Sequence, residues 1–200
     1  MQIEEAAVTW PEGHQQPTGK ITYHYYTDEA CKKELAAGEL PVDAGTYYVK
    51  ATLTQDDYYE AAVSNVATLV INKATPVLKN LKGAAEITYG DTLGATEPVG
   101  KALGVTEQSI DGTFAWKDPA QRPSAAGIAT AEVIFTPSEL LAKNYTTATG
   151  TARVTVNKAT PTITADPFTK VFDGEAVKSI PAAVTGVDGE ETGQTLVYEF

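Results

Sequence analysis

Apolar and polar residues alternate with a period of two along most of the chain, in runs that are short. Between residues 21 and 26, Ile21, Tyr23 and Tyr25 alternate with Thr22, His24 and Tyr26, which predicts a strand with one face inward. A second strand is predicted from Gly45, with an inward set of Tyr47, Val49, Ala51 and Leu53. Gly, Pro, Asp and Asn separate such runs, and helical periodicity is nearly absent. The pattern therefore predicts an all-β fold.

The string Asn72 to Pro76 returns 85 residues later as Asn157 to Pro161. A strand-like run precedes each copy, and each copy ends in a Pro, which lacks the N–H that a sheet ladder needs. We interpret the string as the last strand of one domain plus the joint to the next. A repeat of this period predicts an array of similar domains, with bounds at residues 1–74, 75–159 and 160–200.

The second stretch repeats the strand order of the first with different side chains. Phe114 and Trp116 match the strand at residues 21–26, and an Ala-Gly pair precedes both of the longer strands. The inward set of the second copy is Ala129, Ala131, Val133 and Phe135. Residues 77–110 are expected to supply its opening strands, whereas the opening strands of the first domain are expected to be short or missing.

The last stretch, residues 160–200, is expected to supply opening strands of a truncated third repeat without closing ones. It begins with Ile163 and reaches Val171-Phe172 ahead of an Asp-Gly turn. Unpaired strand edges invite pairing between chains. We therefore predict that this tail is either poorly ordered or adds to another molecule's sheet. Because Phe200 falls inside a strand-like run, we interpret the chain as a piece of a longer protein.

The charge and the amino-acid composition argue against several classes of function. The formal charge of −11 and pI near 4.6 argue against nucleic-acid binding, which depends on Lys and Arg at phosphates. Cys31 is the only cysteine, so no disulfide can form within the chain. Residues 1–8 lack the basic and apolar segments of a signal peptide, and no apolar run is long enough to span a bilayer.

Short strands separated by turns predict a two-sheet antiparallel sandwich. Asp43, Gly45 and Tyr47 form the pattern D-x-G-x-Y, which resembles the tyrosine corner of immunoglobulin-like domains. In those domains a Tyr hydroxyl bonds back to nearby backbone, and a cysteine follows two residues later, where this chain has Val49. The resemblance implies tandem immunoglobulin-like antiparallel β-sandwich domains in which aliphatic contact replaces the inter-sheet disulfide. The second copy has Ala129 at the Tyr position.

The wider pattern, A-G-T-Y-Y-V-K-A-T followed by S-N-V-A-T-L-V-I-N-K-A-T-P, resembles the tandem Ig-like repeats of large bacterial surface proteins called MBG or YDG repeats. The string K-V-F-D-G at residues 170–174 is similar to their Y-D-G signature, with Phe for Tyr. The resemblance implies an extracellular or cell wall-attached segment that acts as a stalk, spacer or adhesin repeat. Its implied partners are neighbouring repeats of the parent chain and, for an adhesin, a surface glycan or a host or matrix protein.

Tyrosine is the most distinctive candidate chemistry, since seven of the ten lie in the first sixty residues. If the two strands of the first domain are neighbours, Tyr26, Tyr48 and His24 share an outer face that can stack on sugars or anchor a protein. The competing interpretation is that aromatic residues fill sheet faces because they pair well across strands. A carbohydrate- or protein-binding module, or an accessory domain of an extracellular enzyme, therefore stays an alternative function.

No residue set predicts catalysis, a cofactor or a metal. His14 and His24 lie outside any nucleophile or metal spacing, and Cys31 has no recognisable partner besides its lysine neighbours. Acidic clusters offer oxygen ligands for calcium but lack the spacing of a calcium loop, so solvated turns are the favoured interpretation. These clusters are Asp56, Asp57 and Glu60, and Asp188, Glu190 and Glu191.

Overall fold

The structure is a computed structural model that describes residues 7–177 and 182–189. Over these residues it confirms the predicted all-β class, with several antiparallel sheets, two short 3-10 turns and no α-helix. Contacts group the chain into two compact units. The first unit extends to Ala74 and includes Lys143–Tyr145, and the second unit contains Thr75–Ala142 and the residues from Thr146 onward. The division into three repeats at 1–74, 75–159 and 160–200 stays a prediction.

The first unit contains one sheet. Strand β2 (Gly45–Leu53) pairs antiparallel with β1 (Ile21–Tyr26), β3 (Ala62–Val63) and β4 (Ala67–Ile71). No side chain between residues 7 and 74 is fully buried. The prediction that Tyr23 points into a core is wrong, because this side chain is 38% exposed. The physical reason is that no second sheet covers this face among the described residues of the first unit.

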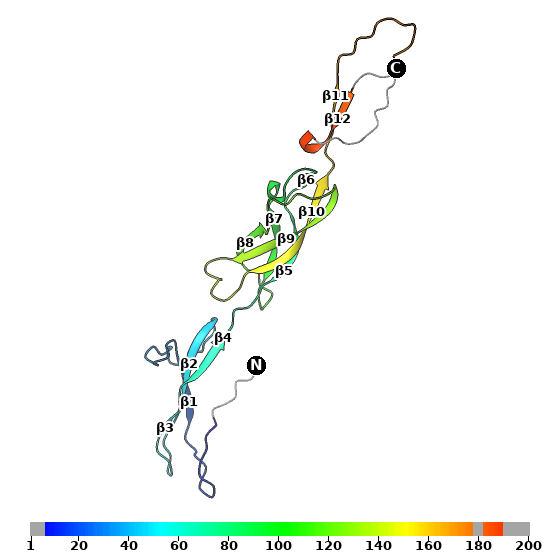
Figure 1. The fold of residues 1–200 in the computed structure, drawn as a ribbon. Helices are drawn as coiled ribbons and strands as arrows, with labels where there is room; N and C mark the ends of the chain where they lie inside the picture. The colour runs from blue at the N-terminus through cyan, green and yellow to red at the C-terminus, as the bar shows by residue number, and fades with distance from the viewer. Residues whose placement is uncertain (1–6, 178–181, 190–200) are drawn as a thin grey trace. The chain divides into compact units, whose positions relative to one another are not determined.

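The second unit has a sheet with the strand order β7-β5-β10-β9-β8 (Figure 1). The strands β5 and β6 pair with β10 in parallel, and the other pairs are antiparallel. A 3-10 turn, η1 (Leu93–Ala95), connects β6 to β7. The strands are β5 (Val77–Gly83), β6 (Ile87–Thr88), β7 (Pro98–Leu103), β8 (Gly112–Trp116), β9 (Gly127–Pro137) and β10 (Ala148–Asn157).

The closing strands of the two units share one pairing register. Gly45 pairs with Ile71 between β2 and β4, and Gly127 pairs with Val156 between β9 and β10. The next inward residues keep this match, since Tyr47 pairs with Leu69 and Ala129 pairs with Val154. The predicted alignment of the two stretches therefore agrees with the observed strands position by position.

The opening strands also recur. A hairpin-like pair forms from β11 (Thr162–Ala165) and β12 (Ala182–Thr185), followed by the short turn η2 (Val187–Gly189). Ile163 pairs with Val184 in this hairpin, as Leu78 pairs with Ala102 between β5 and β7. The strand expected near residues 195–198 lies outside the described residues.

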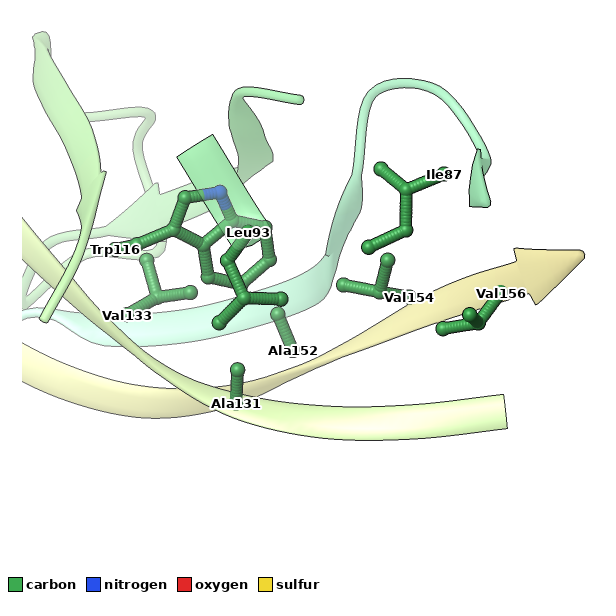
Figure 2. Close-up of a cluster of buried hydrophobic side chains, with 8 residues drawn as sticks. All are labelled: Ile87, Leu93, Trp116, Ala131, Val133, Ala152, Val154 and Val156. Carbon is green, nitrogen blue, oxygen red and sulfur yellow. The ribbon is translucent and has the colours of Figure 1, made fainter. Parts of the chain in front are cut away.

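The core of the second unit lies between β8, β9 and β10 on one side and η1 and β6 on the other (Figure 2). In Figure 2 the large side chains of Leu93 and Trp116 lie over the small ones of Ala131 and Ala152. The Trp116 indole Nε1–H donates to the Thr96 carbonyl at 2.6 Å, which satisfies the polar atom of this buried ring. The buried residues of the cluster are Ile87, Leu93, Trp116, Ala131, Val133, Ala152, Val154 and Val156.

Candidate functional site

The three residues of the predicted ligand surface lie close together on β1 and β2. Tyr26 is directly opposite Tyr48 in the β1–β2 ladder, and His24 lies two residues from Tyr26 on the same face. All three side chains are half-buried. We call Tyr26, Tyr48 and His24 the tyrosine strip.

A short loop after β1 covers part of the strip. The carboxylate of Asp28 accepts the backbone N–H of Lys33 at 2.6 Å and that of Lys32 at 3.0 Å, which folds the loop back on itself. Cys31 sits in this turn with a φ of 53°, and its backbone N–H donates to the Asp28 carbonyl at 2.9 Å. The folded loop brings Glu34 into a β-bridge with Tyr26.

His24 is held by internal hydrogen bonds. Its Nδ1 lies 2.6 Å from Glu34 Oε1, and its Nε2 lies 3.2 Å from Thr52 Oγ1. Because both ring nitrogens have protein partners, the imidazole is oriented and has no free lone pair for a metal in this arrangement. Sequence reasoning missed Glu34, since its approach to His24 depends on the fold of the intervening loop.

The electrostatics of the strip favour a neutral tyrosine. Partial burial raises the pKa of Tyr26 above its ordinary value, and the negative charges of Glu34 and Cys31 raise it further. The Tyr26 hydroxyl is therefore a protonated hydrogen-bond donor at neutral pH. A neutral phenol, a second aromatic ring and an acid side by side can stack on a sugar ring and bond to its hydroxyls, or can anchor a peptide.

The acidic cluster after β2 is a folded turn built on Asp56. Its carboxylate accepts the backbone N–H groups of Thr18 at 2.7 Å, Tyr58 at 2.9 Å and Tyr59 at 2.8 Å, and the Thr18 hydroxyl at 3.2 Å. The backbone N–H of Thr18, followed by that of Tyr58, does most to lower the Asp56 pKa to about 2. These donors occupy the oxygen atoms that a cation would need.

The D-x-G-x-Y pattern forms the hydrogen bond that the resemblance implies. The Tyr47 hydroxyl donates to the Asp43 carbonyl at 3.0 Å. Within the same unit, the Asp43 carboxylate accepts the Asn144 side-chain amide at 2.7 Å and the Lys143 ammonium at 2.8 Å. These two contacts, with Asn144 first, lower the pKa of Asp43. Sequence reasoning missed Asn144, which lies 101 residues from Asp43 along the chain.

The remaining candidates are dispersed. The Nδ1 of His14 lies 3.3 Å from the Glu12 carbonyl, and the Cys31 thiol lies 3.6 Å from the Glu29 carbonyl. Over residues 7–177 and 182–189, no three His, Cys, Asp or Glu side chains are grouped as metal ligands would be. Glu190 and Glu191 of the second acidic cluster lie outside the described residues.

Comparisons with known proteins give no family assignment. No protein-family model matches the chain, and no curated protein matches it either. Across the part of the chain that the structure describes, no helix is both long and apolar enough to cross a membrane.

Proposed function

We propose that the chain is a non-catalytic structural segment: tandem immunoglobulin-like repeats that form a stalk, spacer or adhesin repeat of a secreted or surface-attached bacterial protein. The single observation that carries this proposal is the recurrence of one strand register in two stretches of different side chains. A fold retained while its side chains differ is expected when its shape, rather than one reactive group, is what the protein uses.

The strand order of the second unit supports a load-bearing role. The strands of its six-stranded sheet that come first and last in sequence, β5 and β10, are parallel neighbours, with Arg153 opposite Lys82. At the end of β10, Val156 and Asn157 pair in parallel with Ile87 and Thr88 of β6. Traction on the chain before β5 and after β10 therefore loads these ladders in shear, so several hydrogen bonds must break together.

Local contacts strengthen the end of β10. The Tyr89 backbone N–H donates to the Asn157 carbonyl at 2.8 Å, and the Asn157 side-chain amide donates to Glu86 Oε2 at 2.9 Å. Asn157 is the first residue of the repeated string, and Pro161 ends that string. Pro fixes its own φ and biases the residue before it to an extended geometry, which suits a short joint between repeats.

Single-molecule force spectroscopy on the full chain tests the proposal. With handles at the two termini, we expect a discrete unfolding event for residues 76–157 that releases about 280 Å of contour, at ~3.5 Å per residue. As a control, handles are attached at Cys residues in the Cys31→Ser background, placed by Asp111→Cys and Ser138→Cys. These sites load β8 and β9 from the end where Gly112 is opposite Pro137. Strands peeled in this way separate one hydrogen bond at a time, so a much lower force is expected. Equal forces in the two geometries contradict the load-bearing role.

A second candidate function is recognition of a carbohydrate or a protein by the tyrosine strip. The observation that favours it is the direct opposition of Tyr26 and Tyr48 beside a fixed His24. Glycan-array binding that is lost in Tyr26→Ala and Tyr48→Ala, but kept in Tyr58→Ala, supports this function. Tyr58 is the matched control because its ring is 70% exposed and lies outside the strip. Binding that survives both strip substitutions rejects it.

A further inference from the structure

Strands β7, β5 and β10 of the second unit, which are neighbours in one sheet, carry four exposed cations (Figure 1). Lys79 of β5 is directly opposite Lys101 of β7, and Lys82 of β5 is directly opposite Arg153 of β10. We call Lys79, Lys82, Lys101 and Arg153 the basic face. Like charges directly opposite each other destabilise a sheet, so two such pairs side by side are not explained by the stability of the fold.

The buried neighbours of these residues show that the basic face points away from the core. Ala102, next to Lys101, is 2% exposed. Ala152 and Val154, on either side of Arg153, are 0% and 1% exposed. Because successive side chains of a strand point to opposite faces, Lys101 and Arg153 lie on the outward side of the sheet. The lysines opposite them share that side.

A β-bulge in β5 brings its two lysines to the same side. Lys79 is opposite Lys101 and Lys82 is opposite Val99, so three steps along β5 correspond to two steps along β7. Asn80, inside the bulge, has a φ of 56°, in the left-handed region. Without the extra residue, two positions three apart in a strand point to opposite faces. The bulge therefore adds a second lysine of β5 to the basic face.

The basic face has no acidic partner among the residues that the structure describes. Residues 75–159 contain eight basic side chains, and four of them form this face. Of the other four, Lys117, Arg122 and Lys143 lie 2.7, 3.7 and 2.8 Å from a carboxylate oxygen. Glu97, an exposed acid next to β7, forms no ion pair within the described part of the chain. Acidic side chains outnumber basic ones 26 to 15 in the sequence, so carboxylates are not scarce.

The chemistry of the face selects among anions. Three of its four cations are lysines, which act as point charges and suit singly charged groups such as sulfate esters, whereas the fork of Arg suits bidentate binding of phosphate. Thr151 and Thr155 flank Arg153 on the outward side of β10, and their hydroxyls can bond to the hydroxyls of a sugar. Strands β5, β7 and β10 contain no aromatic residue, so they offer nothing on which a nucleic-acid base can stack.

We propose that the basic face binds a sulfated polysaccharide whose sulfate groups contact the cations across the three strands. The polyanion releases condensed counterions when it binds, as nucleic acids do when lysines meet their phosphates. At 0.1 M salt the Debye length is about 10 Å, so acidic groups farther away on the chain oppose binding only weakly. This inference goes beyond the proposed spacer function, and it does not involve the tyrosine strip, which lies in the first unit.

Fluorescence anisotropy with a labelled, sulfated heparin oligosaccharide tests the proposal on the full chain at about 0.1 M NaCl. We expect binding that weakens at least about tenfold when the sulfate groups are removed from the oligosaccharide. With ~0.7 counterions released per cation, log affinity is expected to fall with log salt at a slope of about −3, and Lys82→Gln is expected to reduce this slope by about 0.7. Equal binding of single-stranded DNA or of polyglutamate overturns the proposal, as does no binding by millimolar protein.

Two charge reversals separate binding from folding. Lys79→Glu and Lys101→Glu each place an acid opposite a lysine, so attraction replaces repulsion across the strands. In a Trp10→Phe background, the unfolding temperature reported by Trp116 fluorescence is therefore expected to rise in both variants. Binding of the sulfated oligosaccharide is expected to weaken at least about tenfold in both, because a contact is lost and an anion is added.

Lys20→Glu is the matched control for these variants. Lys20 is an exposed lysine of the first unit, so the substitution changes the net charge equally but lies outside the basic face. We expect its affinity for the oligosaccharide to stay within about twofold of the parent chain. A loss in Lys20→Glu as large as that in Lys79→Glu shows a response to net charge alone and refutes the site. Unchanged binding in Lys79→Glu, or a lower unfolding temperature in that variant, also refutes it.

Discussion

Matched alanines in the two units allow a direct test of the repeat and of what covers each sheet. Ala67 and Ala152 occupy one position in the shared register, and only Ala152 is buried, at 0% exposure. We predict that Ala152→Leu destabilises the second unit and that Ala67→Leu leaves the chain nearly unchanged. The same chemical change is made at both positions, so β propensity cancels in the comparison.

The magnitude follows from the packing around Ala152. Its strand partner Ala131 is 6% exposed, and Val133 and Leu93 in the same cluster are 0% and 1% exposed, so no space is left for a larger side chain. Inserting methylene groups into such a core typically costs ~1–3 kcal/mol, and about 2 kcal/mol is expected for this substitution. For a unit of this size that corresponds to a fall in Tm of roughly 8–16 °C. An exposed substitution such as Ala67→Leu is expected to stay within about 0.5 kcal/mol.

Trp116 fluorescence reports the second unit directly. All variants are made in a Trp10→Phe background, which leaves Trp116 as the only tryptophan. Its fluorescence then follows the thermal unfolding of the second unit alone. Circular dichroism follows the whole chain in parallel. Equal losses in Ala152→Leu and Ala67→Leu, or an unchanged Trp116 transition in Ala152→Leu, would falsify the shared register or the assigned core.

Three further predictions concern single side chains. The Asp56 pKa of about 2 in the folded chain lies below its unfolded value of 3.8, so the ionised carboxylate stabilises the fold fully above about pH 4, and this stabilisation is lost as pH falls from about 4 to about 2. In unfolding measurements, Asp56→Asn is expected to reduce the dependence of the free energy of unfolding on pH between about 4 and about 2. The control Asp57→Asn is expected to leave that dependence unchanged. Tyr47→Phe, which removes the bond to the Asp43 carbonyl, is expected to lower the urea-unfolding free energy of the first unit by about 1 kcal/mol, against less than about 0.5 kcal/mol for Tyr58→Phe. Trp116→Phe leaves a buried carbonyl without its donor, and a calorimetric loss of about 2–3 kcal/mol is expected; a loss below about 1 kcal/mol contradicts the assigned bond.

Local patterns in the sequence were sufficient for several parts of the structure. The period-two runs predicted β1 and β2, because successive side chains of a strand point to opposite faces, so a strand with one apolar face has alternating apolar and polar residues. The D-x-G-x-Y resemblance implied the hydrogen bond from Tyr47 to Asp43, whose partners are four residues apart. The opposition of Tyr26 and Tyr48 followed from the expected neighbouring strands.

Those patterns could not predict contacts between segments that are far apart in the sequence. The partnership of Glu34 with His24 depends on how a loop folds, and that of Asn144 with Asp43 joins segments 101 residues apart. The parallel ladders of β10 with β5 and β6 likewise depend on which edges meet, because alternation specifies the faces of a strand and not its neighbours.

Ala67 and Ala152 show the division between the two kinds of information. The sequence by itself determined that both alanines belong to closing strands ahead of the repeated string. Both lie in runs with a period of two, and the repeated string follows each run directly in the sequence. Only the tertiary structure decided that Ala152 is buried and Ala67 is exposed. Burial is decided by what lies across from a residue, and strands β5 to β7 supply that cover in the second unit.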